Sequence, residues 1–281
     1  EHQCAEYLPQ IGSGELTATL AYAGSNGGHD SSAITATATK RGDNYVLNGS
    51  YRYVIDGDSS ELLIVAVRRP STVGDEGVSL FCLSRDALGV KTKWLPTMDQ
   101  TRRQAEITLT NVTLGKDALM GEEGGAWSSL EKALDLATIA VAAEQAGGAQ
   151  QVLDMTVAYT KERQQFGRTV ASFQAVKHQA ADMMVAAESA KSAIYYAGCV
   201  AHEAMYGGPL GVELAEAASI AKAQCSAAFF ANASTAIQLH GGVGFTWEYD
   251  VHLYFKRAKS SEILFGNAQY HRERLAKMLL D

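Results

Sequence analysis

The spacing of apolar residues changes near Gly121, and this change constrains the fold more than any other feature of the sequence. Before it, short apolar runs rich in β-forming residues alternate with turn dipeptides such as Asn48-Gly49. After it, apolar residues recur every three or four positions over long stretches, as on the buried face of a helix. We therefore expect an α+β chain, with a β-barrel or sandwich over residues 15–118 and a helical domain over residues 119–281.

The helical half contains three long periodic stretches and two shorter ones. The predicted helices cover residues 130–167, 173–205, 211–242, 249–264 and 268–280. The segment Gly207-Gly208-Pro209 ends the second long helix, because glycine and proline both interrupt helical hydrogen bonding. Long helices joined by short breaks favour an antiparallel, four-helix-bundle-like domain. Residues 1–14 resemble the end of a helix, which we interpret as the remnant of a preceding N-terminal helical domain.

Composition excludes several classes of protein. A formal net charge of −7 disfavours a nucleic-acid binder, which needs a basic surface. No apolar run approaches the roughly 20 residues that a membrane helix requires, so we expect no membrane insertion. The four cysteines are irregularly spaced without a CxxC pair, which predicts no metal site and no disulfide framework. Reduced thiols are typical of a cytoplasmic protein.

Two motifs in the helical half indicate a family. The first is RQQFGRTVASFQ over residues 163–174, and the second is QLHGGVGF over residues 238–245. Together they resemble the RxxFGxxxxxxQ and QxxGGxGF signatures of the acyl-CoA dehydrogenases, in the family's order and after a β-rich half. The resemblance extends over the whole chain. It implies a FAD-dependent oxidoreductase that introduces a double bond between the α and β carbons of an acyl-CoA thioester.

The resemblance also implies which residues bind FAD, and their chemistry is suited to that role. An arginine offers a forked, permanently charged donor set to a diphosphate, and paired glycines let the backbone approach it. Taken singly, a helix-end arginine is often a solvated cap, a glycine pair is often a turn, and a phenylalanine is often core. The implied cofactor-binding residues are Arg163, Phe166, Gln174, Gln238, Gly241 and Gly242.

The proton-abstracting base of the family is missing from its two usual positions. Acyl-CoA dehydrogenation requires a positioned carboxylate, because the α-proton is weakly acidic. An ungapped comparison with the family pattern places Phe265 at the first position. The second position follows an LDL-like step on the first long helix, where this sequence has Ala137. Neither side chain can accept a proton. Glu262 and Glu144 are the nearby carboxylates that remain, and Glu262 is the weak alternative base.

The segments that border the flavin ring in the family are also altered. Residues 21–28 replace the family's TEPGxGSD loop, and residues 53–57 replace its WxTNG strand. Tyr53 keeps an aromatic ring for stacking, whereas Ile55 has no hydroxyl group to donate to the flavin.

These losses predict a non-catalytic subunit. In the family, each flavin ring lies in one subunit while the neighbouring subunit binds the adenosine end, so this chain is expected to bind a partner's FAD. The resemblance implies an unlike acyl-CoA dehydrogenase subunit in a heterotetramer, as in fatty acid or sterol side-chain β-oxidation, and an electron-transfer partner. Two alternatives remain open. They are a homotetrameric dehydrogenase with Glu262 as a displaced base, and a flavin monooxygenase or non-redox binding module of the same fold.

Overall fold

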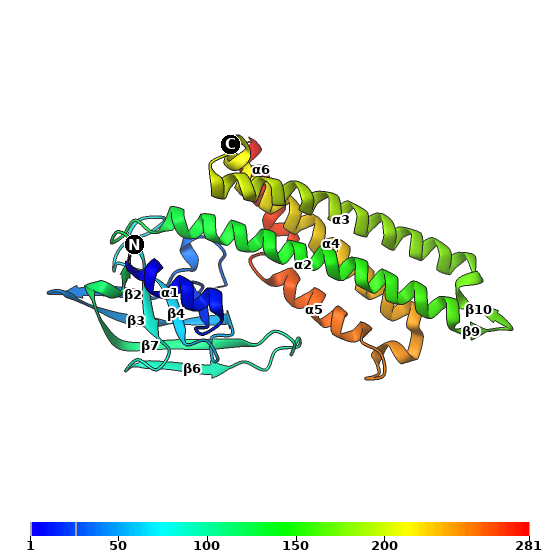
Figure 1. Ribbon diagram of the computed structural model, residues 1–281, viewed down its shortest axis with the longest axis horizontal. Coiled ribbons are helices and arrows are strands. Elements are labelled where there is room, and N and C mark those ends of the chain that lie inside the picture. Colours follow the sequence, from blue (N-terminus) through cyan, green and yellow to red (C-terminus); the bar gives the residue numbers. More distant parts are fainter. Residues whose placement is uncertain (1, 26, 281) are drawn as a thin grey trace. The chain divides into compact units, whose positions relative to one another are not determined.

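The chain folds into two compact units, and the computed structural model describes residues 2–25 and 27–280 (Figure 1). One unit extends to Glu131 and the other begins at Lys132. Helix α2 (Trp127–Glu162) begins in the first unit and contributes most of its length to the second. Within the described ranges, no helix is both long enough and apolar enough to cross a membrane.

The first unit is a short helix followed by a mixed sheet, which confirms the expected β-rich half. Helix α1 (His2–Ser13) precedes eight strands arranged in the order β6-β7-β3-β2-β4-β5-β8, with β1 beside β4. The strands are β1 (Ala18–Ala21), β2 (Thr37–Arg41), β3 (Asn44–Ile55), β4 (Leu62–Arg68), β5 (Val78–Ser84), β6 (Val90–Trp94), β7 (Gln104–Gly115) and β8 (Leu119–Met120).

Most neighbouring strands are antiparallel, but β4 runs parallel to both β1 and β2. The described strands form an open path from β6 to β8, so the sheet is not a closed barrel. Alternation of apolar residues reports which face of a strand is buried and not whether the sheet closes, which is why the sequence leaves barrel and sandwich unresolved.

The core of this unit lies on β3, β4, β5 and β7. Strand β4 is buried on both faces, as its nearly continuous apolar sequence predicts. The fully buried Tyr51 donates its hydroxyl proton to the carbonyl of Ala66 at 2.9 Å, so its one polar atom is satisfied. Gly49 has φ +149°, and a Cβ there would lie 2.5 Å from the Cα of Ala36. This close approach of β3 to Ala36, the residue before β2, therefore requires glycine.

The second unit contains the five predicted helices. The first predicted helix is shorter than expected, because α2 ends at Glu162 and a small hairpin follows it. Gly207, in the left-handed conformation at φ +86°, caps α3 where the sequence predicts a break. The elements after α2 are β9 (Gln164–Gln165), β10 (Arg168–Thr169), α3 (Gln174–Tyr206), α4 (Leu214–His240), α5 (Val251–Ile263) and α6 (Ala268–Leu280), with the 3₁₀ turns η3 (Val170–Ser172), η4 (Pro209–Glu213) and η5 (Gly241–Phe245).

Helix α4 is the centre of this unit, and it is buried along most of its length. Its Asn232 side chain donates to the carbonyl oxygens of Ala149 on α2 and Met183 on α3, at 3.1 and 3.0 Å. Gly148 makes room on α2 for the Phe229 ring, because a Cβ at residue 148 would lie 2.5 Å from that ring. Glycine costs helix stability, and here it permits close packing of two helices.

The polar contacts along α4 define the direction of its neighbours. On α2, Gln145 contacts Ser226 and Ala149 contacts Asn232, so α2 and α4 run parallel. On α3, Met183 contacts Asn232 whereas the later Ala190 contacts Cys225, so α3 runs antiparallel to α4. The end of α2, the start of α3 and the end of α4 therefore lie at the same end of the helical unit (Figure 1).

Candidate functional site

The structure brings all six predicted cofactor-binding residues to this one end of the helical unit. Arg163 and Phe166 lie in the connection from α2 to α3, and Gln174 is the first residue of α3. The other three lie at the end of α4 or in the turn that follows. Tyr159 of α2 joins the two groups, because its hydroxyl donates to the His240 carbonyl at 3.3 Å and the two rings stack at 4.3 Å. All six residues are exposed: Arg163, Phe166, Gln174, Gln238, Gly241 and Gly242.

The polar side chains of this set are available to bind a ligand. With the described residues, the side chains of Arg163, Gln174 and Gln238 make no hydrogen bond or ion pair. Arg163 follows the last residue of α2, where its charge also complements the negative end of the helix dipole. A free guanidinium and two free amides on one exposed surface can bind an anionic, hydrogen-bonding ligand such as the nucleotide portion of FAD.

The backbone after α4 requires glycine and leaves space beside it. Gly241 adopts φ +65° and ψ −144°, a region that only glycine occupies readily. A Cβ at Gly241 or Gly242 would meet no atom within 4 Å, so these glycines leave the backbone accessible from outside. Gly244 differs, because a Cβ there would lie 3.0 Å from the Ile237 carbonyl oxygen. The first two glycines fit a ligand-facing role, and the third is explained by packing.

A two-residue hairpin that the sequence analysis missed holds Phe166 away from the helices. Phe166 (φ +55°) and Gly167 (φ +78°) form its turn between β9 and β10, as in a type I′ turn. A left-handed phenylalanine costs about 1 kcal/mol. The Phe166 residue is 92% exposed, and its ring meets that of Phe173 in a T-shaped arrangement, with the centroids 6.3 Å apart. An exposed aromatic ring on a strained turn is suited to covering the apolar surface of a ligand or a neighbouring subunit.

Both expected base positions carry side chains that cannot accept a proton. Phe265 lies between α5 and α6 with φ +59°, and Ala137 lies half-buried on α2. The loop around Phe265 is fixed by two buried residues. His271 donates from Nε2 to the Phe265 carbonyl at 3.1 Å. Lys222 Nζ donates to the carbonyls of Glu262 and Gly266 at 3.0 and 2.9 Å.

The sequence does not predict a role for Lys222, because the residues next to it in the chain give no sign that its side chain is buried. Its side chain is completely inaccessible, and burial lowers its pKa to about 8. The third bond of its ammonium group goes to Ser226 at 3.2 Å, so all three donors are used.

The remaining carboxylates near Phe265 are engaged in ion pairs. Glu262 lies 2.8 Å from Lys259 on the same helix. Glu144 lies 3.3 Å from Arg257 and accepts a hydrogen bond from Ser261 at 2.9 Å. Each carboxylate therefore has a cationic partner within the helical unit, which is typical of carboxylates that stabilise the fold.

The expected base positions and the predicted cofactor-binding residues lie far apart on the helical unit. Lys222, which contacts the loop around Phe265, and Gln238 lie 16 positions apart on α4. At 1.5 Å per residue, this separation is about 24 Å along the helix axis. The exposed end of the unit and the neighbourhood of Phe265 are therefore two separate places on this chain.

The two segments expected near the flavin ring are brought together in the first unit. The backbone N–H of Arg52 donates to the Ala23 carbonyl at 3.2 Å. Tyr53 lies at a register shift between β3 and β7, with φ +58° and a 56% exposed ring. Gly24 is needed for packing, because a Cβ there would lie 2.1 Å from Thr35 Oγ1. Asn26, within the altered 21–28 loop, lies outside the described residues.

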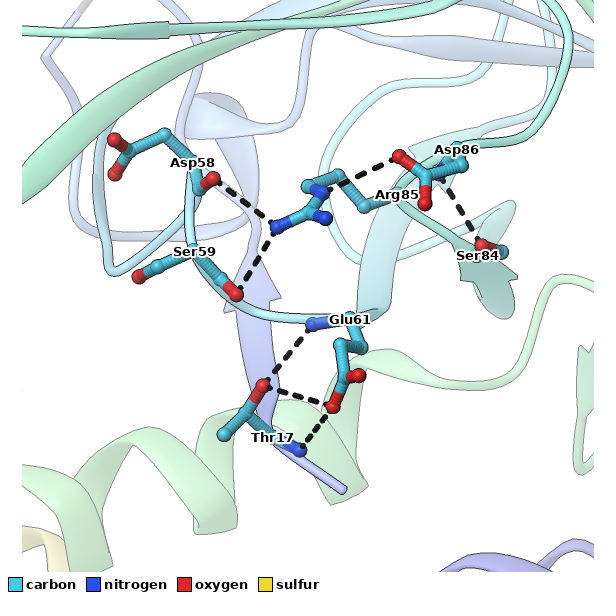
Figure 2. A network of polar contacts seen from close by, with 7 residues as sticks. All are labelled: Thr17, Asp58, Ser59, Glu61, Ser84, Arg85 and Asp86. Atoms are coloured by element: carbon cyan, nitrogen blue, oxygen red, sulfur yellow. Dashed lines mark hydrogen bonds and ion pairs between the residues drawn. The ribbon is translucent and has the colours of Figure 1, made fainter. Parts of the chain in front are cut away.

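A polar network that sequence reasoning missed fixes the turn after Tyr53 (Figure 2). Arg85 donates to the carbonyl oxygens of Asp58 and Ser59 at 3.2 and 3.1 Å. Arg103 forms an ion pair with the Asp58 carboxylate. This turn is thus held by two arginines that adjoin other strands, Arg85 after β5 and Arg103 before β7.

Comparison with known proteins gives one consistent result. The model of the family "Acyl-CoA dehydrogenase, C-terminal domain" matches residues 124–280, more than half of the chain. Acyl-CoA dehydrogenase IpdE2 of Mycolicibacterium smegmatis is 36% identical over 223 residues, 79% of this chain and 60% of that protein. The bovine mitochondrial short/branched chain specific acyl-CoA dehydrogenase is 30% identical over 281 residues, 99% of this chain and 63% of that protein.

The fold agrees with these relatives. The structure of butyryl-CoA dehydrogenase from Megasphaera elsdenii superposes with a TM-score of 0.90 at 28% identity, covering 98% of this chain and 71% of that one. The chain belongs to the acyl-CoA dehydrogenase family, a family of FAD-dependent oxidoreductases. It spans less than two thirds of the length of the bovine and mycobacterial relatives.

Proposed function

We propose that this chain is the non-catalytic subunit of a heteromeric acyl-CoA dehydrogenase and that it binds the diphosphate and adenosine portion of a partner subunit's FAD. The observation that carries the proposal is the contrast between its two sites. The exposed end of the helical unit retains a free cation and a glycine turn, whereas Phe265 and Ala137 occupy the base positions.

The residues at the exposed end fit a dinucleotide. Arg163 offers its guanidinium to the diphosphate, and the turn at Gly241 and Gly242 admits phosphate oxygens close to the backbone. Gln174 and Gln238 are free to donate to ribose or adenine. When bound, FAD supplies the hydride acceptor for dehydrogenation, and this chain's contribution is to hold and orient it. All six residues face outward, which supports a ligand shared with a second subunit.

The carboxylates near Phe265 are poorly placed to act as a general base supplied by this chain. A general base must lie within hydrogen-bond reach of the proton it abstracts. Glu262 is paired with Lys259, and Glu144 is paired with Arg257. The proposal therefore assigns proton abstraction to the unlike subunit, and reoxidation of the flavin to an electron-transfer partner. A cytoplasmic location is part of the proposal, and four free cysteines accord with it.

Co-expression tests this proposal. Alone, the chain should purify without flavin or should aggregate. With an unlike acyl-CoA dehydrogenase subunit it should give a yellow complex that oxidises an acyl-CoA. In that complex, Arg163→Gln should weaken FAD binding about ten-fold or more, because a charge-assisted phosphate contact is lost. Arg272→Gln is the matched control, since Arg272 lies exposed on α6.

Two results would contradict the proposal. One is a stable homotetramer of this chain that binds FAD and turns over an acyl-CoA without a partner. The other is equal FAD affinity in the Arg163 and Arg272 variants of the complex.

A further inference from the structure

The contact between Tyr159 and His240 lies where the two predicted binding motifs meet. The rings stack with centroids 4.3 Å apart and an interplanar angle of 17°. The Tyr159 hydroxyl also donates to the His240 backbone carbonyl at 3.3 Å. The Tyr249 ring meets both rings edge-on, at 5.5 Å from Tyr159 and 5.8 Å from His240. The contact therefore combines side-chain and backbone atoms of His240.

His240 is held in one orientation and one tautomer. Its Nδ1 lies 2.7 Å from the Ala236 carbonyl oxygen. A carbonyl oxygen only accepts, so Nδ1 carries the proton. The residue is 5% exposed, and burial lowers its pKa below the ordinary value. The ring is therefore neutral near neutral pH, which suits stacking against the Tyr159 ring.

The location of this contact relates it to the binding surface. Tyr159 lies one helical turn before Arg163, and its carbonyl accepts the Arg163 backbone N–H at 2.9 Å. His240 immediately precedes Gly241, whose backbone N–H donates to the carbonyls of Ile237 and Gln238. The contact thus joins the segment that carries the cation to the segment that carries the glycine turn.

We propose that Tyr159 and His240 are positioning residues, which set the location of Arg163 relative to the Gly241-Gly242 turn so that both contact one dinucleotide. This inference rests on the proposed function and deepens it. Neither residue is assigned a contact with the cofactor. Each acts through the backbone segment next to it.

A packing role alone predicts a different response from a positioning role. If the pair only fills space, substitutions should lower thermal stability, and FAD affinity should follow that loss. If the pair positions the turn, a substitution that keeps the ring should change FAD affinity and local backbone dynamics with little change in thermal stability. Tyr159→Phe retains the ring and removes the hydrogen bond to His240, so it separates the two cases.

The experiment uses the co-expressed complex with Tyr159→Phe, Tyr159→Leu and His240→Phe. Tyr195→Phe and Tyr195→Leu are matched controls, because Tyr195 is 69% exposed on α3. Three quantities are measured for each: the FAD dissociation constant, the thermal midpoint, and hydrogen exchange of amides 241–246 in the FAD-free complex. The exchange measurement needs no cofactor, so it reports on the contact even if Arg163→Gln refutes the proposed function.

Tyr159→Phe should weaken FAD binding about three-fold, and Tyr159→Leu about ten-fold or more, because a hydrogen bond and then a ring contact are lost. Exchange at residues 241–246 should rise in the same order, while the midpoint of Tyr159→Phe matches that of the Tyr195 controls. His240→Phe keeps the stacked rings, so its FAD affinity and its exchange at residues 241–246 should lie between those of the two Tyr159 variants. Wild-type FAD affinity in Tyr159→Leu would overturn the inference. Parallel loss of affinity and midpoint, or failure of all three variants to fold, would show a purely structural role and overturn it as well.

Discussion

The buried Lys222 gives the sharpest quantitative prediction. Its ammonium group is inaccessible, and burial lowers its pKa from 10.5 to about 8. Glu262 and Cys225 oppose this shift only in part. In the unfolded chain the amine is solvated and retains the ordinary value. Between these two pKa values the unfolded state binds more protons than the folded state, so stability must rise with pH.

The size of the effect follows from the shift. With one pKa unit worth about 1.4 kcal/mol, the ionised Lys222 costs the folded state about 3 kcal/mol at pH 7. By the same linkage, only about 1 kcal/mol of that cost remains at pH 10, because most of the folded population is then neutral at this position. Wild-type unfolding free energy should therefore include a gain on the order of 2 kcal/mol from Lys222 between pH 7 and pH 10.

The perturbation is Lys222→Met, whose unbranched side chain is one heavy atom shorter than that of lysine and cannot titrate. Urea denaturation at fixed protein concentration, at pH 7, 8, 9 and 10, gives the difference in unfolding free energy between wild type and variant. That difference should change by about 2 kcal/mol across the series in favour of wild type at high pH. Lys132→Met is the control, since Lys132 makes one bond to the Ala204 carbonyl and is exposed. A difference for Lys222→Met that stays constant with pH would refute the reasoning.

Three further predictions concern the carboxylates and the base positions. Phe265→Glu alone should not give acyl-CoA turnover without a partner subunit, because the flavin-ring segments of the family remain altered; dye reduction by the purified variant would contradict this. Glu262→Gln should leave turnover of the co-expressed complex within about two-fold of wild type, whereas loss of a true general base lowers the rate by roughly 10²–10⁴-fold. Asp135→Asn should lower the unfolding free energy by about 3 kcal/mol, because it leaves the partly buried Arg274 without its carboxylate partner. A loss below about 0.5 kcal/mol in urea denaturation would place that ion pair among the weak surface pairs.

The helical unit follows closely from the sequence because its signal is strong and local. Apolar residues at helical spacing predict all five helices, and the glycines at 207 and 208 correctly end one of them. The end of α2 is missed for a local reason. The QQFGR segment continues the spacing of polar and apolar residues seen in the helix. Phe166 and Gly167 nevertheless adopt left-handed backbone angles and form the turn of a hairpin. Only the Gly167 signal was available from the sequence.

The sheet and the buried polar network are harder to predict. Alternation identifies the strands, but the parallel pairing of β4 with β1 and β2 depends on contacts between segments distant in sequence. The sequence around Lys222 has an ordinary composition, and its ammonium group is bound by the carbonyls of Glu262 and Gly266, 40 and 44 positions away. The candidate binding residues were found from motif spacing. Their common location follows only once α2, α3 and α4 have been given their directions.

The number of flavins per polypeptide in the purified native complex is the most direct test of the proposal that this chain binds the FAD of an unlike catalytic subunit. It is measured from the flavin absorption and the subunit stoichiometry of the same sample. We predict one FAD for every two chains, with this chain and an unlike partner present in equal amounts. One FAD per chain, in an assembly built from this polypeptide alone, would contradict the account.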